Sequence, residues 1–172
     1  MSAESEQQRR LGHRFIIATW IALMVLVYFM FSNMLENDYN PNQQPVISEN
    51  GAVREIILKR NRYGHYVATG RINNTPVTFL LDTGASDISI PGKLARKLNL
   101  KKGPQQYYKT ANGTVVGYLT RLDTVSLGTI TLRNVRASIN PSMKGSDVLL
   151  GMSFLRKIEF TQRGDTLILR QR

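Results

Sequence analysis

The chain has 172 residues, a formal net charge of +11 and no cysteine. The lack of cysteine excludes disulfides, thiolate metal sites and a cysteine nucleophile, and two histidines, His13 and His65, leave little room for a histidine-rich metal site or a Ser–His triad. Hydrophobic residues make up 42% and charged residues 20%, a globular and not a disordered composition. The length predicts one domain, or one domain and a tail.

The first predicted element is a membrane-spanning helix over residues 15–35, a run of 21 residues without a charge. At about 1.5 Å per residue this run spans roughly 30 Å, the thickness of a bilayer core. The alternatives are a cleaved signal peptide and a buried soluble helix. The run is longer than the usual apolar part of a signal peptide, residues 32–35 offer no small-x-small cleavage site, and no polar face exists. We therefore favour an uncleaved anchor in the lipid bilayer.

The flanking charges predict its orientation. Arg9, Arg10 and Arg14 precede the run, and the next basic residue is Arg54. Positive flanks stay in the cytoplasm, so residues 1–14 are expected to be cytoplasmic and the C-terminal part to lie outside. In a bacterium this corresponds to a single-pass protein of the inner membrane whose C-terminal domain is periplasmic.

Residues 36–53 are rich in Asn, Gln and Pro and predict a linker without a packed core. A domain is then expected over residues 54–172. Its part from residue 67 onward carries 16 basic and 6 acidic side chains, a net charge of +10. Anionic lipid would suit such a surface, but a basic surface that merely keeps the domain soluble is the simpler interpretation. Because the basic residues are scattered, we expect no nucleic-acid partner.

Within this domain most signals are those of short strands. Three pairs of apolar, β-branched runs flank short turn sequences and predict hairpins. The turns are Asn73-Asn74, Gly128-Thr129 and Arg163-Gly164-Asp165. A helix is expected after Pro91 and a second, short one after Gly151. The fold class is therefore mainly β, with one or two short helices.

The residues most suggestive of chemistry are Asp82-Thr83-Gly84-Ala85-Ser86, between apolar residues 77–81 and 88–90. Alone, Asp-Thr-Gly is typical of an ordinary turn. Here, however, the flanks place the carboxylate at the end of a buried strand, where an unpaired charge is costly. A strand restarts immediately afterwards, so a functional reason for Asp82 is expected.

This pattern resembles the aspartic proteases of the retroviral, retropepsin-like type. Three further segments match in order and spacing: the helix-like stretch 91–100, a flap-like hairpin over residues 107–119, and the apolar-apolar-Gly segment 148–155. The resemblance covers roughly residues 65–170 and is closest to the single-domain bacterial group with an N-terminal membrane anchor. It implies a closed acid-protease barrel of short strands preceded by one transmembrane helix.

The resemblance also implies a role for each matching residue. Asp82 is the catalytic carboxylate. The Thr83 hydroxyl ties two catalytic loops together across a dimer interface, and Gly84 lets the backbone approach substrate. The catalytic-loop support comprises Thr83, Gly84, Ala85 and Ser86. The flap comprises Thr110, Ala111, Asn112 and Gly113, and the structural support comprises Leu149, Leu150 and Gly151.

The sequence departs from the retroviral pattern at one pair of positions. Retroviral enzymes carry an acid four residues after the catalytic Asp and an Arg just after the second conserved Gly, where this chain has Ser86 and Met152. Both partners are missing together, so neither charge is left unpaired. Asp87 follows one residue later, and the sequence does not identify its partner.

A single Asp-Thr-Gly has a consequence for the mechanism. Aspartic proteolysis needs two carboxylates that share a proton, so the second must come from another copy, which predicts a symmetric homodimer acting on polypeptides. No metal and no cofactor is expected. The alternative is a non-catalytic module of the same fold that binds peptides or mediates dimerisation, with Asp82 as a relic.

Overall fold

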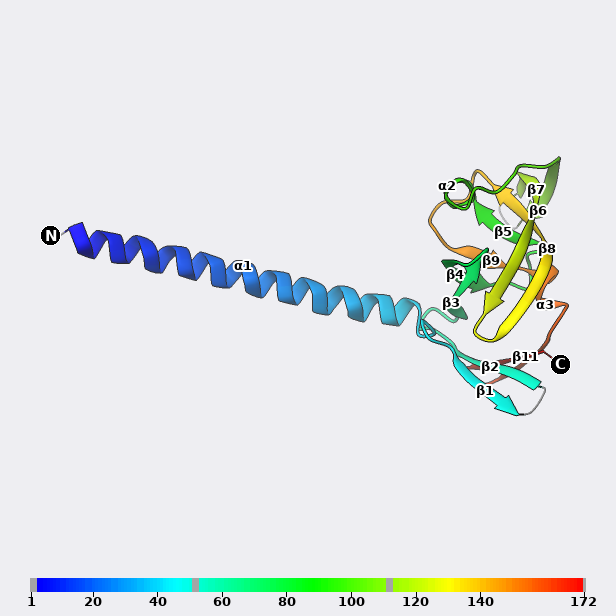
Figure 1. Ribbon diagram of the computed structural model, residues 1–172, viewed down its shortest axis with the longest axis horizontal. Coiled ribbons are helices and arrows are strands. Elements are labelled where there is room, and N and C mark those ends of the chain that lie inside the picture. Colours follow the sequence, from blue (N-terminus) through cyan, green and yellow to red (C-terminus); the bar gives the residue numbers. More distant parts are fainter. Residues whose placement is uncertain (1–2, 51–52, 111–112, 172) are drawn as a thin grey trace. The chain divides into compact units, whose positions relative to one another are not determined.

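The computed structural model describes residues 3–50, 53–110 and 113–171. Its residues form two compact units, one ending at Asp38 and the other beginning at Tyr39. The first unit is helical and the second is built mainly of strands (Figure 1). The functional residues suggested by the sequence belong to the second unit.

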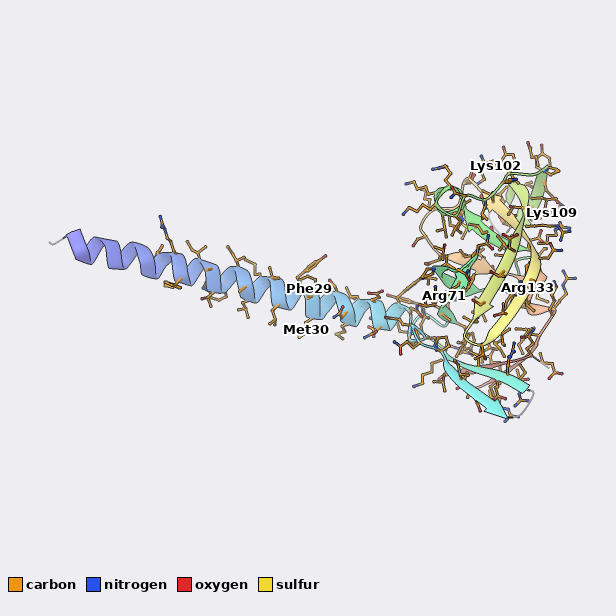
Figure 2. All side chains as sticks on the ribbon, in the orientation of Figure 1. Phe29, Met30, Arg71, Lys102, Lys109 and Arg133 are labelled. Carbon is orange, nitrogen blue, oxygen red and sulfur yellow. The ribbon has the colours of Figure 1, made fainter. Side chains whose placement is uncertain are left out.

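Helix α1 (Ala3–Tyr39) contains the apolar run expected to be helical. In the part of the chain that the structure describes, it is the one helix long and apolar enough to cross a membrane. Its apolar side chains, among them Phe29 and Met30, are exposed along the helix (Figure 2). The run has no polar face, so apolar side chains surround the helix on all sides.

The remaining elements lie in the second unit. The strands are β1 (Val46–Asn50), β2 (Val53–Lys59), β3 (Val67–Ile72), β4 (Thr75–Leu81), β5 (Ile88–Pro91), β6 (Gln105–Thr110), β7 (Gly113–Leu127), β8 (Ile130–Asn140), β9 (Val148–Leu150), β10 (Glu159–Arg163) and β11 (Thr166–Gln171). The helices are α2 (Gly92–Lys97) and α3 (Met152–Leu155). Both short helices occur where the sequence predicts them, although α2 ends before residue 100.

The strands form two sheets. One has four strands in the order β1-β2-β11-β10, and the other has seven in the order β3-β4-β9-β5-β8-β7-β6. Strand β3 also pairs with β7, so the seven-stranded sheet closes on itself, as expected for a barrel. The long strands β7 and β8 run side by side through this sheet (Figure 1).

The three predicted hairpins are confirmed as β3–β4, β7–β8 and β10–β11. Asn73 and Asn74 have φ angles of 46° and 66°, which a two-residue hairpin turn of the mirror-image type requires. Asparagine tolerates this left-handed conformation better than most residues with a side chain. The turn is therefore specified locally.

The structure differs from the expected linker after Tyr39. Asn40 and Asn42 are buried, and β1 pairs with β2 in the four-stranded sheet. The Asn42 amide donates to the carbonyl oxygens of Lys59 at 2.8 Å and Val67 at 2.7 Å. Polar composition favours loops, but here the amide groups satisfy backbone atoms of the domain and so become part of it.

The core lies between the two sheets and within the barrel. Phe79, Ile88, Ile90 and Leu150, from β4, β5 and β9, have no or almost no exposed surface. Burying each such side chain contributes about 1.5–3 kcal/mol. These strands flank the Asp82 segment, so the core holds both ends of that segment in place.

Candidate active site

Asp82 begins residues 82–87, which connect β4 to β5 and which we call the catalytic loop after the role expected for Asp82. Strand β9 lies between these two strands, parallel to β4 and antiparallel to β5. The backbone N–H of Asp82 donates to the Leu150 carbonyl at 3.3 Å, and the Gly84 N–H donates to Asp82 Oδ1 at 2.8 Å. The carboxylate is half-buried and oriented by the loop's own backbone.

The segment around Gly151 supports this loop from behind. The Met152 N–H donates to the Ala85 carbonyl at 2.8 Å, and Ser153 Oγ accepts from the Ile88 N–H at 3.0 Å. A Cβ at Gly151 would meet the Ala85 carbonyl oxygen at 2.6 Å and would lie closer still to that of Asp87. Only a glycine therefore allows the loop to approach this closely.

The other residues of the predicted loop and support occupy different environments. Thr83, Gly84 and Ser86 are exposed and Ala85 is half-buried. Leu150 is fully buried, and its carbonyl oxygen accepts the Asp82 N–H. Leu149, predicted as support, is among the residues that line the cleft described below.

The predicted flap corresponds to the β6–β7 hairpin. Thr110 pairs with Gly113 across its end, and Thr110 Oγ1 donates to the Gly113 carbonyl at 2.7 Å. Gly113 has a φ of 106°, a conformation that favours glycine. Ala111 and Asn112 lie outside the described residues.

A cleft of about 710 Å³ lies between the catalytic loop and the flap hairpin. Its lining comes from the loop, from β6 and β7, and from β5, β8 and β9. The lining includes Asp82 from the catalytic loop and Arg136 from β8. The cleft thus brings together segments that are far apart in the sequence.

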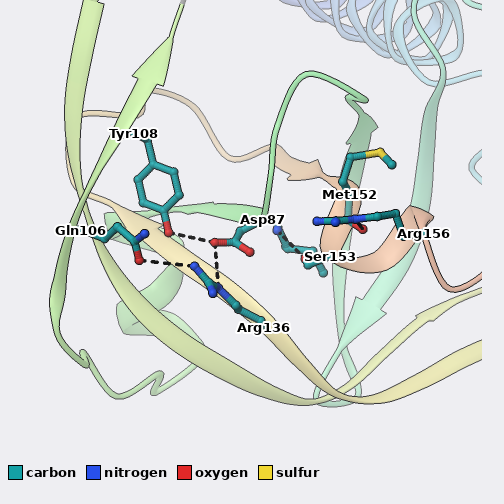
Figure 3. A network of polar contacts seen from close by, with 8 residues as sticks. Asp87, Gln106, Tyr108, Arg136, Met152, Ser153 and Arg156 are labelled. Atoms are coloured by element: carbon teal, nitrogen blue, oxygen red, sulfur yellow. Dashed lines mark hydrogen bonds and ion pairs between the residues drawn. The ribbon is translucent and has the colours of Figure 1, made fainter.

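Asp87 forms the centre of a polar network at this cleft (Figure 3). Its side chain is only 6% exposed, and its Oδ2 accepts from Tyr108 Oη at 2.9 Å and from Arg136 Nε at 3.1 Å. Arg136 Nη2 donates in turn to Gln106 Oε1 at 3.3 Å. The network joins the catalytic loop to β6 and to β8.

Asp87 changes the acidity of both donors. Its charge raises the pKa of Arg136 above the ordinary value. Burial of the Tyr108 phenol, followed by its hydrogen bond to Asp87 and the charge of that carboxylate, raises the pKa of Tyr108 as well. Both groups therefore stay protonated and keep donating to Asp87 throughout the neutral range.

Residues 68–157, 90 of the 172, match the sequence family described as gag-polyprotein putative aspartyl protease. This range contains the catalytic loop, the β6–β7 hairpin and the Gly151 segment. The chain belongs to the retropepsin-like aspartic protease family. The fold predicted from the Asp82 motif is thereby confirmed.

A solved relative has the same retropepsin-like fold. The crystal structure of a retropepsin-like aspartic protease from Rickettsia conorii is 31% identical, with a TM-score of 0.59 over 73% of this chain and 97% of that chain. Two uncharacterised proteins also match. One, from a Sinorhizobium species, is 33% identical over 81% of this chain and 62% of its own length. The other, from Rickettsia prowazekii, is 30% identical over 90% of this chain and 70% of its own length.

The partners of Asp87 are the residues that sequence reasoning missed. Tyr108 and Arg136 lie 21 and 49 positions further along the retropepsin-like chain. The position after Gly151, where the retroviral pattern has an arginine, holds Met152 instead. Without knowledge of the β5–β8 pairing, no spacing in the sequence connects Asp87 with Arg136.

The variant Tyr108→Phe tests the contribution of this network to stability. We expect its free energy of unfolding to fall by about 1–3 kcal/mol, because the buried Asp87 loses a donor. Because the pKa of Tyr108 is raised in the folded state, the full stabilisation is present below the unfolded-state pKa of about 10. It is lost as the pH rises through the folded-state pKa. Urea unfolding of the unit beginning at Tyr39, at pH 7 and at alkaline pH, measures both effects.

The matched control is Tyr107→Phe, since Tyr107 is 68% exposed on the same strand. Its free energy of unfolding should change by no more than about 0.5 kcal/mol. Equal losses in the two variants would contradict a stabilising role for the Tyr108–Asp87 hydrogen bond.

Proposed function

We propose that this retropepsin-like chain is an aspartic endopeptidase whose active form is a homodimer. One observation carries the proposal. Among the described residues that line the cleft, the carboxylates are Asp82 and Asp87, and Asp87 is engaged by Arg136 and Tyr108. Asp82 therefore remains for chemistry, and a second catalytic carboxylate has to come from a second copy.

Two Asp82 carboxylates on a two-fold axis would share one proton. The ionised group takes a proton from a water molecule, whose oxygen attacks the carbonyl carbon of the peptide bond. The protonated group donates to the carbonyl oxygen while charge develops there. Transfer of a proton to the amide nitrogen then releases the amine product, and the pair returns to its singly protonated state. The N–H of Gly84 supports this chemistry by holding Oδ1 of Asp82.

The experiment that tests this proposal compares peptide cleavage by the chain and by its Asp82→Asn variant. A peptide-binding or dimerisation module of the same fold would show no difference, because neither variant would cleave. Exposure of Thr83 and Gly84 in the single chain agrees with a partner covering them in the active form.

We also propose that residues 15–35 anchor the enzyme in a bacterial inner membrane, with residues 1–14 in the cytoplasm and the protease unit in the periplasm. Helix α1 has the length and apolarity that such a span requires. The arginines at positions 9, 10 and 14 support this orientation through their preference for the cytoplasmic side.

A reporter that is active only outside the cytoplasm tests the proposed anchor. Fused after Arg172, it should be active, and the fusion should remain with the membranes after a high-salt wash. A matched fusion to the chain with Leu23 and Val27 replaced by Arg should lose membrane insertion, since each central arginine costs about 2.5–3.5 kcal/mol. Release of the unaltered fusion by salt alone would contradict an integral span.

A further inference from the structure

Two arginines stand directly opposite each other on the long hairpin. Arg121 of β7 pairs with Arg136 of β8 in the antiparallel register. Side chains in such positions share one face of the sheet, with Cβ atoms about 4.5–5.5 Å apart, and like charges there are destabilising. The fold keeps this pair although a neutral residue at either position would avoid the repulsion.

Among the described residues, a buried carboxylate bonds to Arg136 and none bonds to Arg121. Arg136 bonds to Asp87, as described above. Arg121 donates from Nη1 to the neutral Oδ1 of Asn134 at 3.0 Å. Both side chains remain accessible, since Arg136 is 51% exposed and Arg121 is also exposed. Each guanidinium has five N–H donors, so donors remain for a ligand.

These arginines both line a second hollow, of about 680 Å³. Arg136 lines both cavities, whereas Arg121 lines only the second. The other charged residues lining the second hollow are Lys101, Lys102 and Asp123. Four basic side chains therefore accompany a single acidic one in a hollow that shares Arg136 with the lining of the Asp82 cleft.

We propose that Arg121 and Arg136 form a subsite for an acidic side chain of the peptide substrate, an Asp or a Glu flanking the bond to be cut. This inference rests on the proposed protease function and adds the substrate class. A carboxylate between the two guanidinium groups would relieve their repulsion and accept charge-assisted hydrogen bonds from both. A peptide carboxylate is the favoured occupant because Arg136 also lines the cleft that contains Asp82.

Two random octapeptide libraries, identical except for Glu or Gln fixed at one position, test the subsite on the full chain in detergent. The Glu library should be cleaved with a kcat/KM at least about fivefold higher, since one charge-assisted contact is gained without a change of shape. In Arg121→Gln the ratio should fall to about one, and Arg121→Lys should restore part of it. Arg121→Glu should favour a third library with Lys at that position.

Arg133→Gln is the matched control, because Arg133 is exposed on β8, the strand of Arg136, but lines neither cavity (Figure 2). It removes the same charge and should keep the preference for Glu. A Glu-to-Gln ratio near one in the unaltered chain, or an unchanged ratio in Arg121→Gln, would overturn the subsite. A ratio that falls equally in Arg133→Gln would also overturn it, because total charge would then be the cause.

Binding separates failure of the subsite from failure of the protease proposal. The two libraries are also bound to the Asp82→Asn chain, which keeps both arginines. One outcome is that the unaltered chain cleaves neither library, while the Asp82→Asn chain binds Glu peptides at least about fivefold more tightly than Gln peptides and Arg121→Gln removes that difference. In that case the subsite stands and the protease proposal fails. Equal binding of the two libraries would overturn the subsite whatever the activity.

Discussion

The Asp82→Asn chain is expected to lose peptide cleavage by about 10²–10⁴-fold or more while it stays folded and dimeric. Asparagine has nearly the same shape and can still accept the Gly84 N–H, which lies 2.8 Å from Oδ1 in the unaltered chain. It can neither take a proton from water nor share one with a partner. A homodimer carries the change twice, so that both catalytic groups are lost together. Cleavage assays and sizing of the same preparation measure the two expectations.

A mixed dimer tests the shared site more sharply. One unaltered chain and one Asp82→Asn chain are joined in a heterodimer purified through two different tags. We expect this heterodimer to be nearly inactive, because one carboxylate cannot be both the base and the proton donor. The matched control is a heterodimer with Arg133→Gln in place of Asp82→Asn, which should be as active as the unaltered dimer. Half of the normal activity in the Asp82→Asn heterodimer would mean that each subunit acts alone, and the two-chain mechanism would have to be given up.

The Gly151→Ala chain is expected to lose about 2–4 kcal/mol of unfolding free energy. Its new methyl group would press against the carbonyl oxygens of Ala85 and Asp87, and backbone atoms cannot move aside as the end of a flexible side chain can. The Asp82 N–H is bonded to the neighbouring Leu150, so any shift of this segment also displaces the carboxylate that we propose as catalytic. Activity should therefore fall further than the folded fraction does.

The control for this substitution is Gly164→Ala. Gly164 has a φ of 56° and nothing within 4 Å of an added Cβ, so that the substitution brings only the cost of a left-handed alanine, about 1 kcal/mol. Urea unfolding of the unit beginning at Tyr39 gives both values. If Gly151→Ala is no more costly than Gly164→Ala, close packing is not the reason for a glycine behind the catalytic loop.

Much of the fold around the site follows from local sequence. The Asn73-Asn74 turn, the hairpin at Gly128 and the glycine at position 164 all adopt positive φ angles where the sequence predicts turns. Apolar residues before Asp82 and after Asp87 form β4 and β5, and they leave the catalytic loop between two buried strands. These features could be predicted because each depends on the conformational preferences of a few neighbouring residues.

The stretch between Tyr39 and Asn50 shows why other features could not be predicted. Its asparagines and prolines are typical of a linker, yet Asn42 is 3% exposed and bonded to backbone atoms of β2 and β3. The presence of an asparagine in the sequence does not reveal whether its amide is solvated or hydrogen-bonded inside the domain. Only the position of the partner strands makes the difference.

By itself, therefore, the sequence determined the apolar helix, the hairpins and the place of Asp82 at the end of a buried strand. The tertiary structure alone decided that Asp87 bonds to Tyr108 and Arg136, and that Arg136 stands opposite Arg121. The physical reason is the range of the interactions. Turn and strand preferences depend on a few neighbouring residues. The partners of a charged side chain depend on how the sheet pairs its strands, and paired strands lie tens of residues apart in the chain.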